Sequence, residues 1–136
     1  MDIEAIERAT LAAVPPQRQE TWHEWLLAFD DGTVGRCHSA VPLHHAPPRA
    51  GSLEHIATRY AQAGLDTIIR LPECAAFDAF REELQTHGYT RSKPTAVQVA
   101  ALGPVTTKRA IEVQLADAPR LGWGRVFLGG GVRPVE

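Results

Sequence analysis

Residues 37–45 carry the side chains most often seen in metal sites. Cys37, His38, His44 and His45 lie within nine residues and are residue types that bind zinc. Neighbouring residues of a strand point to opposite faces, and no Cys-x-x-Cys or His-x-x-x-His spacing is present. We therefore predict no metal site. Instead of a zinc site, we expect a loop with titrating histidines.

A second combination has the residue types of a hydrolase triad. Ser39 could act with His38 or His44 and with Asp30 or Asp31. However, no Gly-x-Ser-x-Gly turn exposes Ser39 as a nucleophile. We do not assign a hydrolase.

A third group, Glu20, His23 and Glu24, stands near the start of the first predicted strand. Such side chains can bind an amine or act as a base, provided that they reach the proton to be removed. The alternative is a solvated strand edge.

Periodicity and turn residues predict the elements that must position these side chains. Asp2 is a candidate N-cap, Asp30-Asp31-Gly32 a turn, and Gly64 and Gly88 helix ends. The expected elements are a helix over 2–14, strands near 21–29 and 33–41 as a hairpin, a loop to Ser52, a helix that Ser52 caps, a strand over 67–71, a helix over 75–87, and strands over 89–91, 95–102 and 111–115. This order predicts an α/β (α+β) fold as a single domain, with a mixed sheet flanked by helices. We place that domain at 1–116 and a glycine-rich connector at 117–136.

Charge and composition exclude several classes of protein. The net charge is −2 and the 14 basic residues are scattered, so we expect no nucleic-acid partner. No apolar run reaches the roughly 18–20 residues of a membrane span, and the acidic start predicts no export signal. The two cysteines, Cys37 and Cys74, fit a reducing cytoplasm, although one disulfide between them stays open.

In residues 25–43, a W-L-L-x-F-x-D-G segment leads into R-x-x-S-x-x-P-L. This stretch resembles the opening hairpin of a bacterial group of tandem proteins in the GNAT superfamily of N-acetyltransferases. Leu71-Pro72, residues 84–89 (L-Q-T-H-G-Y) and Val97-Gln98-Val99 resemble its next strand, its helix-to-strand junction and the strand after it. The resemblance covers about residues 5–105 and implies that the mixed sheet is largely antiparallel.

The resemblance implies transfer of an acetyl group from acetyl-CoA directly to a primary amine of a small molecule or peptide. In tandem members a second domain carries the acetyl-CoA site, and residues 119–136 resemble the connector that enters it. We therefore expect an N-terminal, cofactor-poor half that is inactive by itself. Its expected partner is a second GNAT domain, or another copy bound through the apolar segment at Trp123 and Val126-Phe127-Leu128.

Two departures from the family pattern favour this view. The family holds the acetyl-CoA diphosphate with an Arg/Gln-x-x-Gly-x-Gly/Ala loop, whereas residues 45–52 contain two prolines and Arg120-Leu-Gly-Trp-Gly is misspaced by one residue. Arg49, Gly51 and Ser52 remain the cofactor-binding candidates, with simple helix capping as the alternative. Leu84 occupies the position of the tyrosine that protonates the departing thiolate in many members.

The catalytic residues stay unassigned. Glu24, Arg36, His38 and Tyr60 are our candidates for the acceptor cleft. Two further hypotheses remain: a non-catalytic GNAT-like binding or dimerisation module, and a minimal acetyltransferase with an unusual acetyl-CoA loop.

Overall fold

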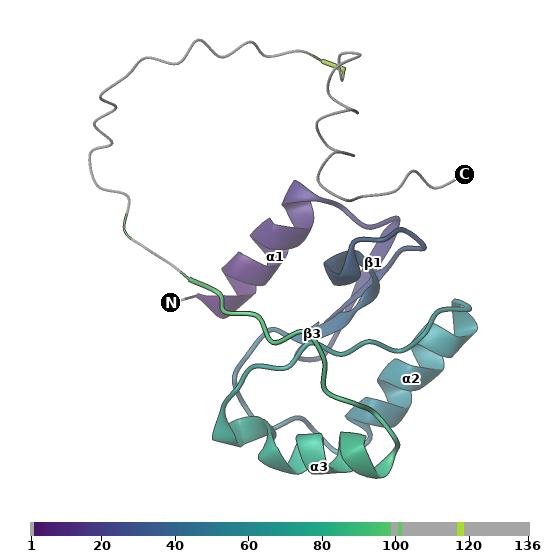
Figure 1. Ribbon diagram of the computed structural model, residues 1–136, viewed down its shortest axis with the longest axis vertical. Helices are drawn as coiled ribbons and strands as arrows, with labels where there is room; N and C mark the ends of the chain where they lie inside the picture. Colours follow the sequence, from purple (N-terminus) through teal and green to yellow (C-terminus); the bar gives the residue numbers. More distant parts are fainter. Residues whose placement is uncertain (1, 99–100, 102–116, 119–136) are drawn as a thin grey trace. The chain divides into compact units, whose positions relative to one another are not determined.

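The computed structural model of the chain describes residues 2–98, 101 and 117–118 (Figure 1). Contacts divide the chain into two units, Met1–Pro94 and Thr95–Glu136. All the helices and strands given below belong to the first unit. The predicted boundary at 116 and the residues of the tail beyond 118 lie outside the described residues.

The N-terminal helix follows its local sequence signals. Helix α1 (Ile3–Ala13) begins after Asp2, whose carboxylate accepts a hydrogen bond from the backbone N–H of Ala5 at 3.0 Å. This contact is the N-cap interaction that satisfies an otherwise unpaired N–H of the first turn. The predicted helix and its cap are therefore confirmed.

The hairpin lies earlier in the chain than predicted. Strand β1 (Arg18–Trp22) pairs antiparallel with β2 (Trp25–Phe29), and His23 and Glu24 form the turn between them. His23 adopts a φ of 49°, in the left-handed region where histidine is found more often than most other residues with a Cβ. The predicted continuous strand over 21–29 is thus wrong, because it turns back on itself between Trp22 and Trp25.

The predicted strand over 33–41 is also largely wrong. Residues Gly35–His38 form a short 3-10 helix, η1, and only β3 (Ala40–Pro42) pairs antiparallel with β2. The buried Cys37 explains the change, since its Sγ lies 3.2 Å from the carbonyl oxygen of Val14. This tertiary contact draws η1 toward the end of α1.

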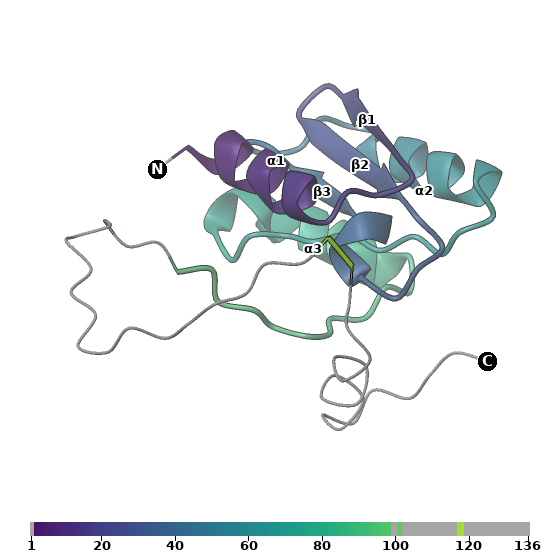
Figure 2. The same cartoon turned by 90° about the horizontal axis from the view of Figure 1, so that it is seen from above.

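The sheet has the order β1-β2-β3, and helices cover both of its faces (Figure 2). An isolated parallel bridge joins Ala40 to Ile69, where the short strand over 67–71 was predicted. The predicted mixed α/β fold, with a largely antiparallel sheet and flanking helices, is confirmed.

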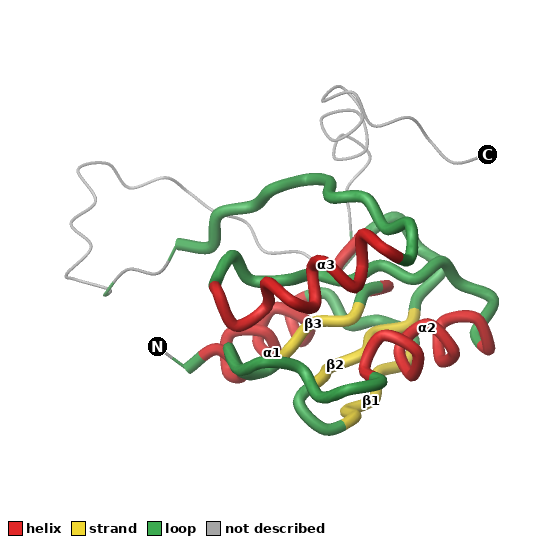
Figure 3. Tube along the Cα trace, turned by 90° about the horizontal axis from the view of Figure 1, so that it is seen from below, coloured by secondary structure: helices red, strands yellow, loops and turns green. Residues whose placement is uncertain are grey.

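Alternation along β2 sends its side chains into two separate clusters. One face packs against α1, through Leu11, Leu26, Ala28, Val41 and Leu43. The other face packs against α2 (Ser52–Gln62) and α3 (Asp78–Thr86), as Figure 3 shows from below, through Trp25, Leu27, Phe29, Ala40, Leu53, Ile56, Tyr60, Phe80 and Leu84. Every residue of β2 is therefore buried.

Glycines close both of these helices, as predicted. Gly64 has a φ of 69° and Gly88 a φ of 82°, the left-handed conformation that glycine adopts readily at a helix end. The predicted helix over 75–87 consists of a 3-10 turn, η2 (Ala75–Phe77), followed by α3. The N-cap of α2 is Gly51 rather than the predicted Ser52, which is already the first helical residue.

The predicted strands after α3 are not seen where the structure describes them. Residues 89–91 and 95–98 contain no strand. The remainder of the strand over 95–102, apart from residue 101, and the strand over 111–115 lie outside the described residues.

Candidate functional site

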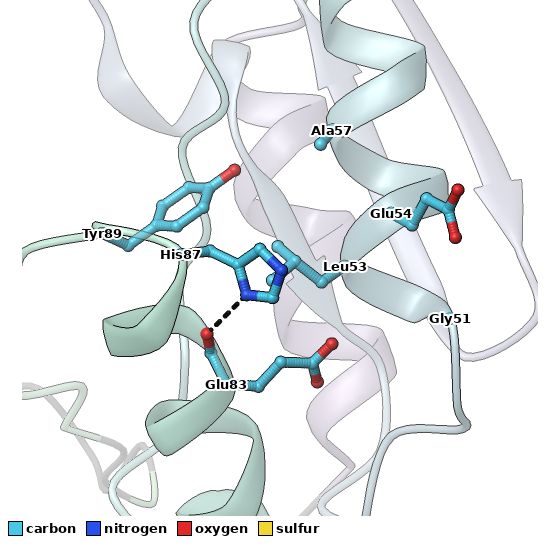
Figure 4. Close-up of a pocket in the computed structure, with 7 residues that line it drawn as sticks. All are labelled: Gly51, Leu53, Glu54, Ala57, Glu83, His87 and Tyr89. Atoms are coloured by element: carbon cyan, nitrogen blue, oxygen red, sulfur yellow. Dashed lines mark hydrogen bonds between the residues drawn. The ribbon is translucent and has the colours of Figure 1, made fainter.

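Two open grooves meet at Gly51, at the start of α2. The larger groove, of about 550 Å³, lies between α2 and the C-terminal end of α3 (Figure 4). Its lining residues are Gly51, Leu53, Glu54, Ala57, Glu83, His87 and Tyr89. The smaller groove, of about 370 Å³, is lined by Trp22, Ala50, Gly51, Glu54, His55 and Thr58.

The ring of His87 lies in the larger groove in a defined tautomer. Its Nδ1 is 2.8 Å from the backbone carbonyl oxygen of Glu83 (Figure 4). A carbonyl oxygen only accepts hydrogen bonds, so this contact assigns the proton of the neutral ring to Nδ1. Nε2 then carries the lone pair, and Figure 4 shows this atom turned toward Leu53 of α2. The groove thus contains a nitrogen that can accept a proton.

The walls around His87 are partly apolar and partly acidic. Leu53 and Ala57 of α2 stand opposite Tyr89, whose hydroxyl end points toward Ala57 (Figure 4). Glu83 extends beside His87, whereas Glu54 lies in the first turn of α2 and points away from the ring. Both glutamates are exposed, and neither carboxylate has a hydrogen-bond or ion-pair partner among the described residues. The groove therefore suits a cationic group on an apolar stem.

The loop before α2 is fastened to the β1–β2 turn. The backbone N–H of Arg49 donates to Oε1 of Glu24 at 3.2 Å, and Nη1 of Arg49 lies 3.1 and 2.9 Å from the two ring nitrogens of His23. The hydroxyl of Ser52 donates to the carbonyl oxygen of Arg49 at 2.8 Å. Four predicted site residues, Glu24, Arg49, Gly51 and Ser52, are thus brought together at one end of α2.

The charge at this end of α2 does not suit the diphosphate of acetyl-CoA. Glu54 places a carboxylate in the first turn, and the guanidinium of Arg49 is held against His23. Pro47 and Pro48 have no N–H to donate. The free backbone N–H groups of the first turn remain able to meet an anion, but no cationic side chain is directed toward them by these contacts. The described loop therefore does not fit the cofactor.

The smaller groove contains a stacked aromatic pair. The rings of Trp22 and His55 lie 3.9 Å apart between centroids and are nearly parallel, with an interplanar angle of 9°. The ring of His23 meets Trp22 edge-on at 4.7 Å. This stack fixes the first strand against α2 and so supports the loop that carries Gly51.

Three predicted acceptor-cleft residues lie elsewhere. Arg36 and His38 are on η1 and line neither groove. Arg36 is exposed, whereas His38 is half-buried, and its Nδ1 is buried without a hydrogen-bond partner among the described residues. Tyr60 is fully buried, and its hydroxyl donates to the carbonyl oxygen of Ala28 at 2.9 Å. Tyr60 therefore packs in the core with the apolar stripe of α2 and lines neither groove.

Tyr60 also cannot replace the tyrosine that is missing at Leu84. Burial raises the pKa of the Tyr60 phenol well above its usual range. Leu84 itself is buried among the residues that join α2 and α3 to the sheet. The structure thus places apolar packing where the family resemblance implies a proton donor.

The two cysteines are free thiols, so the open possibility of a disulfide does not hold. Among the described residues, no three side chains of histidine, cysteine, aspartate or glutamate are close enough to hold a metal ion. The described helices are also too short or too polar to cross a bilayer.

Sequence reasoning missed His87 and Glu83 as site residues. A local signal was present, since the two are four residues apart in the last turn before Gly88. Their relation to Leu53 and Ala57 depends on the approach of α2 to α3. That approach was not visible in either helix alone.

The comparisons with known proteins identify the family. The chain matches the family described as "Probable histone acetyltransferase Rv0428c C-terminal" over residues 1–130, and it belongs to that family. Neither the curated proteins nor the solved structures yield a match. The description refers to a C-terminal domain, whereas the tandem resemblance implied an N-terminal half, so the position of this domain within a longer protein stays a prediction. The family name indicates a function related to acetyl transfer.

Proposed function

We propose that this chain forms the amine-acceptor side of an acetyltransferase and that the acetyl-CoA site lies outside the described residues. A second GNAT-type domain, or another copy of the chain, would provide that site. The proposal refines the acetyltransferase-related function that the family name indicates.

The observation that carries the proposal is the negative charge on the larger groove, from the start of α2 on one wall and from α3 on the other. Glu54 and Glu83 place two unpaired carboxylates on the larger groove. Carboxylates repel a diphosphate and attract a protonated amine. Arg49, the cation of the loop, is directed to His23 instead.

The printed family name suggests the kind of amine. A histone acetyltransferase acetylates lysine, whose ammonium stands on a flexible apolar stem. Leu53, Ala57 and Tyr89 offer an apolar wall for such a stem. We therefore favour a lysine side chain over a small polar amine as the acceptor.

The first experiment tests the missing cofactor site. Calorimetric titration of the full chain with acetyl-CoA and with desulfo-CoA should give no saturable heat up to about 1 mM, the concentration that corresponds to about 4 kcal/mol of binding free energy. Micromolar binding that Arg49→Ala abolishes would contradict the proposal. That result would support a minimal acetyltransferase with an unusual loop.

The second experiment tests the acceptor side. A histone-tail peptide and the same peptide with acetylated lysines should be titrated against the chain at low ionic strength. We expect binding of the lysine form only, because acetylation removes the positive charge. Equal binding of the two forms, or binding of neither, would favour a non-catalytic module, and sedimentation would then show whether the chain self-associates.

A further inference from the structure

We infer that the groove between α2 and α3 binds the acceptor ammonium, and that Nε2 of His87 accepts its proton. The inference rests on the proposed amine acceptor and adds a location and a proton acceptor for it. A lysine-like amine, protonated in water at neutral pH, must lose a proton before its nitrogen can attack as a nucleophile.

The tautomer of His87 gives it this role. The hydrogen bond from Nδ1 to the Glu83 carbonyl oxygen, at 2.8 Å, leaves the lone pair of the neutral ring on Nε2. The same bond also fixes the orientation of the ring, and Figure 4 shows Nε2 directed across the groove toward α2. A histidine held in this way can accept a proton without first rotating or exchanging tautomers.

The groove around the ring fits the rest of the ligand. Its volume of about 550 Å³ is within the size range of small-molecule pockets. Leu53, Ala57 and Tyr89 provide an apolar wall for a lysine stem. The titratable groups that line the groove around His87 are Glu83 on α3, Glu54 on α2 and Tyr89 beyond α3.

The proton transfer balances without any further reactant. One N–H bond of the ammonium breaks, and its electron pair stays on the amine nitrogen. A new N–H bond forms at Nε2, so the ring becomes an imidazolium with a proton on each nitrogen. Glu83, on the turn of α3 below the ring, offsets the positive charge that moves onto His87. The ring then returns the proton to water.

The test is an NMR titration of the isotope-labelled full chain with Nα-acetyl-lysine methylamide. Without the amine, the neutral ring of His87 should show the Nδ1–H tautomer. The amine should shift the signals of Nε2 of His87 and of Tyr89 in a saturable way. The trimethylated probe has no N–H to donate, so it should bind several-fold more weakly and leave Nε2 unshifted.

Matched histidine variants test the acceptor nitrogen. His87→Gln removes the ring lone pair on Nε2 and should weaken binding of the primary amine several-fold. His44→Gln, in an exposed loop position that lines neither groove, should leave that binding unchanged. Circular dichroism would verify that both variants are folded.

Two matched glutamate variants test whether the carboxylate of Glu83 attracts the ammonium. Glu83→Gln should weaken amine binding about two- to fivefold, the range of an exposed ion pair. Glu82→Gln, one residue earlier on α3 and outside the groove, should leave it unchanged. The inference is overturned if the primary and trimethylated probes bind alike, if the amine leaves His87 and Tyr89 unmoved, or if acetyl-CoA shifts these signals instead. Lysine-specific peptide binding with an unmoved His87 would overturn this inference and leave the proposed function standing.

Discussion

Arg59 of α2 holds Glu20 of β1 through two hydrogen bonds, from Nε to Oε1 at 2.8 Å and from Nη2 to Oε2 at 2.7 Å. The hydrogen bonds and charge of Arg59 hold the pKa of Glu20 below its ordinary value of 4.5. This pair ties the edge strand of the sheet to the helix that borders both grooves. Protonation of Glu20 in acid would remove the charge of this pair.

We predict that the stability from this pair is present at neutral pH and is lost in acid. Because the pKa of Glu20 is lowered in the folded state, the unfolded chain takes up the proton first as the pH falls below about 4.5. The urea midpoint of the wild type should therefore fall between about pH 7 and pH 3, and the midpoint of Glu20→Gln should fall less over the same range. Glu82→Gln, whose carboxylate has no partner in the described part, should keep the full wild-type drop.

The buried hydroxyl of Tyr60 gives a second prediction. Tyr60→Phe leaves the carbonyl oxygen of Ala28 without its hydrogen bond and should lower the free energy of unfolding by about 1–3 kcal/mol. The chain has two tyrosines, so Tyr89→Phe isolates the spectrum of Tyr60. In that variant, tyrosinate absorbance should appear only as the protein unfolds in base, since burial raises the pKa of Tyr60. A tyrosinate signal near pH 10 from folded protein would contradict the buried position.

Local signals were enough to predict the helices. Asp2, Gly64 and Gly88 mark their ends through contacts made within a few residues of the chain. The stripe of Leu53, Ile56 and Tyr60 showed the inward face of α2 in the same way. These features do not depend on the rest of the fold, so the sequence contained them.

The turn at His23 and Glu24 could not be predicted, because neither residue is a typical turn former. Asp30-Asp31-Gly32 offered a stronger turn signal, yet the chain only bends there before entering η1. Tertiary contacts decide the outcome. The backbone N–H of Arg49, which lies 25 residues after Glu24, donates a hydrogen bond to the Glu24 carboxylate in the β1–β2 turn.

The candidate site was predicted only in part, for the same reason. Arg49, Gly51 and Ser52 could be placed at the start of α2, because a glycine before a helix is a local feature, whereas their role as cofactor-binding residues stays a prediction. The role proposed for His87 depends on its hydrogen bond to the carbonyl oxygen of Glu83 and on the approach of α2. Periodicity in one helix says nothing about a groove between two.

The conformation of Gly51 gives a third prediction. Its φ of 80° is strained for any residue with a Cβ, although a Cβ added there would meet no atom within 4 Å. Gly51→Ala should therefore cost about 1–2 kcal/mol from backbone strain alone. Gly35→Ala, where the space is also open and φ is not positive, should be neutral or slightly stabilising. Equal denaturant midpoints for the two variants would show that the loop before α2 adjusts freely.

Leu84 gives the last prediction, which concerns the missing proton donor. Restoring a tyrosine there should not create an acetyltransferase, because Leu84 is packed with Trp25 and Phe80 rather than facing either groove. Leu84→Tyr should instead lower the free energy of unfolding by about 1–3 kcal/mol through overpacking. Leu84→Met, which conserves volume, should cost less than about 1.5 kcal/mol. Denaturant unfolding and a thioester-consumption assay with a lysine peptide would measure both effects. A stable Leu84→Tyr chain that consumed acetyl-CoA would mean that a cofactor site is already present and lacked only its acid.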